Sequence, residues 1–379
     1  MKALERRLSG RREASLEELE EVQSELATLS LRELTSLLGR TSASRGAKIL
    51  RLLPPERSAA LFDALTAAHQ ADLIRALGDD KVVNYFGAIG AEDRVALLDH
   101  LPVEIAERLV RQLDEDDQRV TSVVLGYRKG TVGRRMSPKV PNVTPEMTVR
   151  EVVGLLHDHV DELETIYTIP VVDADRSVCG VLRLRSLFRA ADDDRVADLM
   201  EDASVFHAGD DLEDSARWLL SSGRLAVPVV DDDNRLIGIF TYDEAHDVAE
   251  GANSEDSARM GASEALRTPY LSTPVLRLVR SRIVWLLVLA LSAILTVQVL
   301  DIFQATLEQV VVLSLFIPLL TGTGGNTGNQ AATTVTRALA LNDVSKSDIL
   351  SVLWRELRVG MLLGTVLGSM GFLLATAFF

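Results

Sequence analysis

Cysteine is almost absent from this chain of 379 residues, since Cys179 is the only one. A lone cysteine excludes an internal disulfide framework and a cysteine-based metal site, and it favours a reducing compartment. We expect Cys179 to be a small buried residue in a strand. The sequence also lacks a nucleophile–base set and a Walker-type phosphate loop, so it does not predict an enzyme.

Positive charge is scarce as well: 40 Lys and Arg stand against 55 Asp and Glu, a net charge of −15. The imbalance is concentrated in residues 1–282, which hold 36 basic and 50 acidic residues. Such an acidic region argues against a nucleic-acid partner and is compatible with divalent cations. Long apolar runs are missing until residue 283, so we expect no signal peptide.

The last third of the chain is apolar and begins with an 18-residue segment, 283–300, that contains no charge. A helix of this length reaches ~27 Å, close to the thickness of a bilayer core. Arg277, Arg280 and Arg282 precede the segment, whereas the connection 301–308 has no Lys or Arg. Because basic residues stay on the cytoplasmic side, the N-terminus is predicted to lie inside and this connection outside.

A second span is predicted over 309–336, although its apolar part, VVVLSLFIPLL, is 11 residues and reaches only ~17 Å as a helix. The uncharged stretch TGTGGNTGNQAATT, residues 321–334, must then complete the crossing. Glycines and amides at membrane depth indicate irregular backbone that is either buried in protein or lines a water-filled path. Pro318 supports this interpretation, because a proline inside a helix frees a carbonyl oxygen one turn earlier.

A third span is predicted over 359–379. Gly360, Gly364 and Gly368 recur in it every four residues, a spacing typical of close packing between membrane helices.

The acidic region begins with a predicted stack of short amphipathic helices. The stretches AKILRLLPPERSAALFDAL and VALLDHLPVEIAERLVRQL share the order apolar helix, Leu-Pro, charged step, apolar helix. Proline followed by an acidic residue marks a helix start. Repeated pairs of this kind predict a superhelical all-α domain over 31–132, with 1–30 as a separate amphipathic helix or arm.

A second repeat has an offset of 58 residues: IPVVDADRSVCGVLRLRSLF (169–188) matches VPVVDDDNRLIGIFTYDEAH (227–246). Each copy predicts a strand, an aspartate turn, a second strand that opens with a glycine (Gly180, Gly238) and a helix. Two such α/β units in tandem resemble a pair of CBS domains. The stretches RRMSPKV and ADLMEDAS resemble the segments that open such units, which we place at 133–197 and 198–243.

CBS pairs often bind adenine nucleotides, with an aspartate of the pattern T-x-x-D on the ribose. This resemblance makes Thr241 and Glu244 candidates in the second unit, while the first offers Arg183 and Ser186. Neither pair matches the pattern fully.

Residues 244–280 are predicted to be a linker that starts with a strongly acidic helix over 244–266. An acidic helix is usually a solvated one. Its position between the CBS pair and the apolar third favours a functional role in addition to that of a solvated helix. The remainder, 281–379, is the predicted α-helical transmembrane domain.

The order of these parts, ending in PLLTGTGGNTGNQAATTVTRALA (318–340), resembles the MgtE family of magnesium channels over essentially the whole chain. The resemblance implies a homodimer with multiple spans in the cell (inner) membrane and cytoplasmic regulatory domains. It implies Mg²⁺ as substrate and regulator, and ATP as a ligand of the CBS pair. All-oxygen ligands suit a hard ion such as Mg²⁺, but they leave Co²⁺ and Mn²⁺ open.

By the same resemblance, acids of the helical domain and of the linker (plug) helix bind the Mg²⁺ that closes the channel: Glu92, Asp93, Glu244, Asp247, Glu255 and Asp256. One linker position that is often acidic in the family is Ala252 here. The implied pore residues are Pro318, Gly325, Asn326, Gly328, Asn329 and Gln330, with Glu308 near the external mouth.

The family has five spans and carries its pore aspartate on the fifth, whereas three spans are predicted here. We therefore expect either a truncated chain or a separate polypeptide with the missing spans. An alternative function is a membrane-anchored CBS sensor that binds Mg²⁺ or adenine nucleotide and does not conduct.

Overall fold

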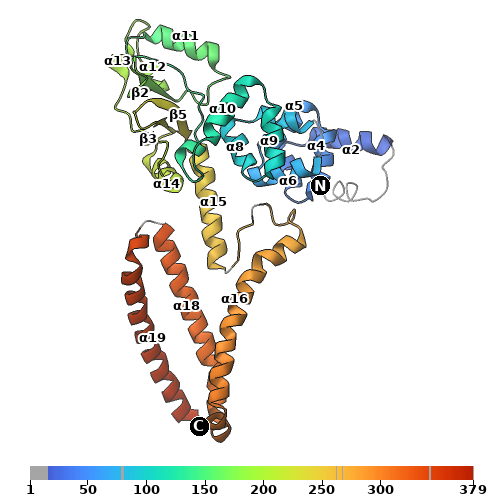
Figure 1. The fold of residues 1–379 in the computed structure, drawn as a ribbon, viewed down its shortest axis with the longest axis vertical. Coiled ribbons are helices and arrows are strands. Elements are labelled where there is room, and N and C mark those ends of the chain that lie inside the picture. The colour runs from blue at the N-terminus through green and yellow to red at the C-terminus, as the bar shows by residue number, and fades with distance from the viewer. Residues whose placement is uncertain (1–15, 78–80, 262, 267, 341–342, 379) are drawn as a thin grey trace. The chain divides into compact units, whose positions relative to one another are not determined.

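The computed structural model describes residues 16–77, 81–261, 263–266, 268–340 and 343–378. The chain divides into two compact units (Figure 1). One unit comprises residues up to 252 together with 266–274, and the other comprises 253–265 and 275–379. Residues 1–15 of the arm predicted over 1–30 lie outside the described residues, and most of the remainder forms a helix.

The first unit begins with a domain of short helices, as predicted. Its helices are α2 (Leu16–Thr28), α3 (Leu31–Leu38), α4 (Ala43–Leu52), α5 (Pro55–Asp63), α6 (Ala67–Leu77), α7 (Lys81–Ala88), α8 (Ala91–Leu98), α9 (Val103–Arg111) and α10 (Glu115–Leu125).

These helices pack in two rows, because each contacts the helix two places further along the chain. One row is α4, α6, α8 and α10, and the other is α3, α5 and α7. Their apolar faces meet in one core that includes Leu34, Ile49, Phe62 and Phe86, all fully buried. The Leu-Pro steps mark helix starts as predicted, with Pro54 and Pro102 at the N-caps of α5 and α9.

The CBS pair follows as two α/β units. Its elements are η1 (Val132–Arg134), α11 (Val149–His159), β1 (Thr168–Val172), β2 (Val178–Arg183), α12 (Leu184–Leu187), α13 (Val196–Leu199), β3 (Phe206–His207), α14 (Leu212–Ser222), β4 (Ala226–Val230) and β5 (Leu236–Thr241). β1 pairs with β2 antiparallel, and β3, β4 and β5 form a second sheet in that order.

The strand pairs β1–β2 and β4–β5 have the same pairing, including the position of a register shift. Val171 pairs with Gly180 and Val229 with Gly238, and in each sheet the register shifts at the following residue. The predicted offset of 58 residues is therefore confirmed. The paired glycines are the third residues of β2 and β5 rather than the first, so the prediction that they open their strands was wrong.

The segment that opens each CBS unit crosses to the sheet of the other unit. Ser137 bonds with Ile239 of β5 through both backbone groups, at 2.8 and 2.9 Å, and Glu201 bonds with Val181 of β2. A Cβ on Gly238 would lie 2.8 Å from the Ser137 carbonyl oxygen. The repeated glycines thus leave room for these crossings.

Cys179 lies in β2, as expected, but it is exposed and not buried. The neighbouring Val181 and Leu182 supply the buried contacts of this strand instead.

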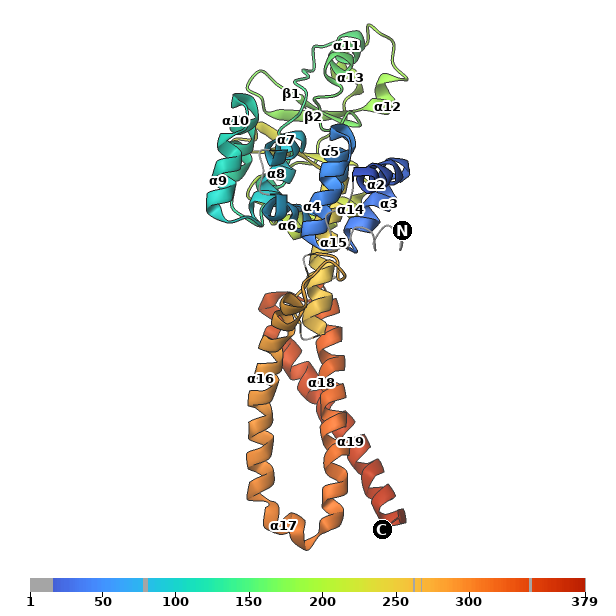
Figure 2. The same cartoon turned by 90° about the vertical axis from the view of Figure 1, so that its right-hand side faces the viewer.

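The remaining elements are long helices and their connections (Figure 2). They are α15 (Tyr242–Met260), α16 (Val275–Ile302), α17 (Gln304–Gln309), η2 (Val311–Phe316), α18 (Ile317–Ala340), η3 (Lys346–Asp348) and α19 (Ile349–Phe378). Among the described residues, two helices are long and apolar enough to cross a membrane, Val275–Ile302 and Ile349–Leu374. The predicted fold class is confirmed: a helical domain, a CBS pair, an acidic helix and a helical apolar region.

Candidate functional site

Two of the predicted acids stand at the start of α8, in the helical domain. Glu92 is 4% exposed, and its carboxylate lies directly over Gly90, where any Cβ would collide with it. One carboxylate oxygen, Oε2, is buried without a hydrogen-bond partner among the described residues. Asp93 follows and is partly buried. A helix N-terminus suits negative charge, so both acids can be held there.

Two more predicted acids stand in the first turns of α15, directly after β5. The Glu244 side chain is 12% exposed, and its Oε2 lies 2.8 Å from Nε of Arg135. The two atoms form an ion pair without the alignment of a hydrogen bond. Asp247 follows by three residues, which places it on the same side of the helix as Glu244.

The structure brings these four carboxylates within electrostatic range of one another. Asp93 and Glu92 both raise the pKa of Glu244, and Asp247 raises those of Asp93 and Glu244. We call Glu92, Asp93, Glu244 and Asp247 the junction cluster, because they join α8 of the helical domain to α15 beside the CBS pair.

Burial is the largest cause of the altered acidity in the junction cluster. It raises the pKa of Glu92 to about 7, of Asp93 to about 6 and of Glu244 to about 8. These values include the effect of neighbouring carboxylates, which also raise the pKa, and of Arg135, which lowers the pKa of Asp93 and Glu244 without cancelling the rise. Asp247 is exposed, and its pKa is also raised, chiefly by partial desolvation. The cluster therefore holds charge that the protein only partly neutralises.

Sequence reasoning missed the charged groups that surround this cluster. Arg135 pairs with Glu244, Lys139 acts on Glu92, and Glu164 acts on both Glu92 and Asp93. The available signal was the arginine pair in RRMSPKV, within a strongly acidic region. Its contacts depend on the tertiary fold, which brings residues more than a hundred positions apart together.

The two remaining acids of the linker prediction lie further along α15. Glu255 pairs with Arg259 at 2.6 Å, and Asp256 lies 3.8 Å from another nitrogen of the same guanidinium. Across the part of the chain that the structure describes, no three acidic, histidine or cysteine side chains are close enough to hold a metal directly.

The stretch predicted to have irregular backbone is regular helix. Residues 321–334 lie inside α18, whose first residues are Ile317 and Pro318. A proline in the first turn replaces an N–H that has no partner within the helix, so it frees no carbonyl. The irregular-backbone interpretation was therefore wrong, and oxygens of this stretch come from side chains.

Side-chain amides nevertheless share one face of α18. Asn326, Asn329 and Gln330 are spaced i, i+3 and i+4, and all are exposed in the described chain. Gly325 and Gly328 lie beside them, and a Cβ at either position would meet no atom within 4 Å. With 24 residues, α18 is long enough to cross a bilayer. It contains many polar residues, however, and is not one of the two helices that are apolar enough to be identified as spans, α16 and α19.

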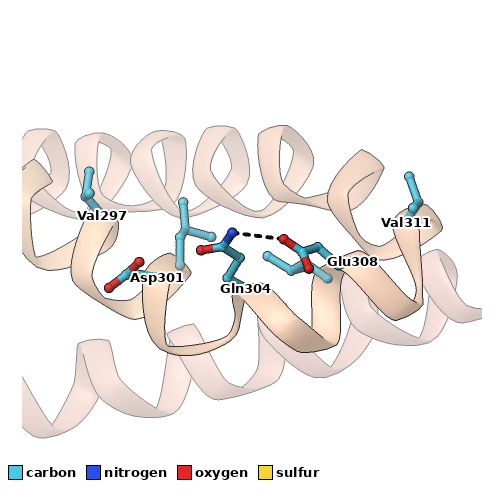
Figure 3. A pocket seen from close by; sticks show the side chains of 7 residues that line it. Val297, Asp301, Gln304, Glu308 and Val311 are labelled. Atoms are coloured by element: carbon cyan, nitrogen blue, oxygen red, sulfur yellow. Dashed lines mark hydrogen bonds between the residues drawn. The ribbon is translucent and has the colours of Figure 1, made fainter.

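Glu308 lies in α17, at the connection between α16 and α18 (Figure 3). Its Oε1 accepts a hydrogen bond of 2.9 Å from Nε2 of Gln304. Both side chains face an open hollow of about 460 Å³. The hollow is lined by Val297, Leu300, Asp301, Gln304, Leu307, Glu308 and Val311.

The predicted nucleotide pair is divided between two environments. Thr241 ends β5, and its Oγ1 is buried without a hydrogen-bond partner among the described residues. The carboxylate of Glu244 faces Arg135 in the junction cluster instead.

Known protein families match the helical domain, the CBS pair and the C-terminal helices of this chain. The family described as "MgtE intracellular N domain" matches residues 29–130, and the CBS domain matches 131–193 and 196–248. The family described as "Divalent cation transporter" matches residues 317–379. These matches define the class: a membrane transporter of divalent cations with a helical domain and a CBS pair.

Individual relatives narrow the class. The magnesium transporter MgtE of Thermus thermophilus is 34% identical over 323 residues, which cover 84% of this chain and 72% of that protein. MgtE of Enterococcus faecalis is 31% identical over 246 residues, 65% of this chain and 54% of that protein. The chain belongs to the MgtE family of magnesium transporters, as its sequence resemblance predicted.

A solved structure resembles the first unit. It is the cytosolic domain of the Mg²⁺ channel MgtE in complex with ATP, 28% identical with a TM-score of 0.56. The match covers 60% of this chain and 93% of that one.

Proposed function

We propose that this chain conducts Mg²⁺ across the cell (inner) membrane and that cytoplasmic Mg²⁺ bound at the junction cluster closes the path. The observation that carries the proposal is the proximity of four carboxylates on α8 of the helical domain and on the acidic helix α15, of which Glu92 is buried and Asp93 and Glu244 are partly buried. Transport rather than catalysis is the role that the family relationship supports.

Buried carboxylates repel one another unless protons or cations neutralise them. Burial and the neighbouring carboxylates raise the pKa of Glu92 and Glu244, so the ionised forms of these groups need further positive charge nearby. Mg²⁺ prefers carboxylate oxygens and retains several of its waters, so it can bridge acids that are too far apart to share it directly. The Oε2 atoms of Glu92 and Glu244 accept no hydrogen bond among the described residues, which fits that requirement. The bound cation would favour the docked arrangement of α8 and α15.

The proposed path for the ion lies along α18. Asn326, Asn329 and Gln330 present neutral oxygens, which can hold a hydrated ion without trapping it. Small neighbours, Gly325 and Gly328, leave room beside the amides. A homodimer would double this face around one axis, and we include that assembly in the proposal.

The orientation of the chain follows from its charges. Arg277, Arg280 and Arg282 belong to the first turns of α16 and favour a cytoplasmic start for this helix. Glu308, in the connection without Lys or Arg, would then lie near the external entrance of the path.

Limited proteolysis of the full chain in detergent tests the regulatory part of this proposal. Millimolar Mg²⁺ should slow cleavage within the segment 242–260, because it favours docking of α15 on the helical domain. Variants with Glu92→Gln and Asp247→Asn should lose most of this protection, whereas Glu107→Gln, an exposed acid of α9 paired with Arg111, should keep it. Equal cleavage with and without Mg²⁺ would contradict the proposal.

A second candidate function is a sensor that binds adenine nucleotide and does not conduct. It is favoured by the similarity to an ATP-bound cytosolic domain and by the unpartnered hydroxyl of Thr241. ATP added in place of Mg²⁺ in the same proteolysis experiment distinguishes the two. Protection by ATP but not by Mg²⁺, removed by Thr241→Val, would favour the nucleotide sensor.

A further inference from the structure

Arg135 is the cation that the protein itself supplies to the junction cluster. Its guanidinium lies 2.8 Å from the Glu244 carboxylate, and the two side chains are only 18% and 12% exposed. It also acts on Asp93 and Asp247. Arginine remains charged at every physiological pH, so this positive charge is permanent.

The position of Arg135 is fixed from both sides. The preceding residue, Arg134, donates to Asp99 Oδ1 at 2.7 Å and to the carbonyl of Leu125, which ties it to the helical domain. Two residues later, Ser137 bonds with Ile239 of β5, the strand that leads into α15. Arg135 therefore stands between the two elements that carry the cluster, and neither anchor depends on a metal.

We propose that Arg135 is a built-in counter-ion that partly replaces Mg²⁺ in the junction cluster and so sets how much Mg²⁺ is needed to dock α8 against α15. The inference rests on the proposed function, in which Mg²⁺ supplies the remaining positive charge. Arg135 is then a positioning residue. Its charge, and not its size, stabilises the carboxylates of the junction cluster. Without that charge, docking should depend entirely on added cations.

Hydrogen exchange of the full chain in detergent tests this inference. The exchange rates are measured on peptides from α8 and from the first turns of α15. In EDTA, Arg135→Met should exchange roughly tenfold faster there than the unaltered protein, because a buried carboxylate loses its partner. Millimolar Mg²⁺ should restore protection of Arg135→Met. This protection should depend more steeply on the Mg²⁺ concentration than it does in the unaltered protein. Arg135→Lys, which keeps the charge, should stay close to the unaltered protein.

Two further variants separate charge from packing. Arg135→Met combined with Glu244→Gln removes both partners and should exchange more slowly in EDTA than Arg135→Met alone. Arg119→Met removes an exposed arginine of α10 that pairs with Asp116, and it should change nothing. Unaltered exchange in Arg135→Met, or no recovery in the double variant, would overturn the inference.

The same data distinguish this inference from the proposed function. If Mg²⁺ protects neither the unaltered chain nor any variant, the Mg²⁺-sensing proposal fails. Fast exchange of Arg135→Met in EDTA would still support the counter-ion role in that case. If Mg²⁺ protects the unaltered chain and Arg135→Met exchanges equally in EDTA, only the counter-ion role fails.

Discussion

At the scale of single residues, burial sets the charge of the junction cluster. Glu92 and Glu244 have pKa values of about 7 and about 8, against 4.5 for an ordinary glutamate. When α8 and α15 separate, both carboxyls return to water and to ordinary acidity. Docking therefore takes up protons over the intervening pH range, and cations can take the place of those protons.

The first prediction concerns pH in the absence of Mg²⁺. A carboxyl whose pKa is raised on docking favours the docked state below about pH 4.5 and loses that contribution as pH rises towards 8. The slope is at most about 1.4 kcal/mol per pH unit for each such group. Hydrogen exchange of α8, corrected for the intrinsic rate at each pH, should become faster between pH 5 and 8.

Glu244→Gln provides the control for this prediction, because it removes one of the titrating groups and should flatten the pH dependence. Mg²⁺ binds deprotonated carboxylates, so its protective effect should grow over the same range. Slower exchange at higher pH in EDTA would contradict the assignment of raised pKa values.

At the scale of elements, two glycines in matching strands differ in how tightly they are packed. A Cβ on Gly238 would lie 2.8 Å from the Ser137 carbonyl and 2.8 Å from the Met136 sulfur. On Gly180 of β2 the corresponding distances are 3.1 Å to the Glu201 carbonyl and 3.0 Å to the Met200 sulfur.

Gly238→Ala should therefore destabilise the CBS pair by about 1–3 kcal/mol, because the crossing segment has to move. Gly180→Ala, its matched control, should destabilise it less. Hydrogen exchange of the β4 and β5 peptides in the full chain measures the difference. A larger effect of Gly180→Ala would show that the crossing of Ser137 onto β5 does not limit the space at this position.

The third prediction concerns the amide face of α18. Asn329→Ala, in the transporter as the cell expresses it, should lower Mg²⁺ uptake by roughly tenfold or more, since an ion-binding oxygen is lost. Asn142→Ala, at an exposed position between η1 and α11, serves as a control for loss of an asparagine. Unchanged uptake of Asn329→Ala at normal membrane levels would remove this residue from the proposed path.

At the scale of the whole molecule, repeats and periodicity made the domain order predictable. Leu-Pro steps indicated where α5 and α9 begin, and the 58-residue offset predicted two matching pairs of strands. Each of these features is a local pattern, and the local structure follows it.

The parts that could not be predicted depend on position within an element or on distant contacts. The composition of 321–334 favours a loop, but Pro318 falls in the first turn of α18 and lets the helix continue. Arg135 joins the junction cluster only because its neighbours are anchored to both the helical domain and β5. The acids Glu92 and Asp247 were predicted from family resemblance, and the fold supplies the reason for their proximity.

Mg²⁺ flux with controlled Mg²⁺ on the cytoplasmic face tests the central claim most directly. In membrane vesicles from cells that express the transporter, millimolar cytoplasmic Mg²⁺ should reduce the initial rate of uptake. With Asp93→Asn and Asp247→Asn combined, the rate should no longer depend on cytoplasmic Mg²⁺, because the cluster then lacks the charge that the cation neutralises. Inhibition of this variant at the same Mg²⁺ concentration and by the same factor would contradict control by the junction cluster.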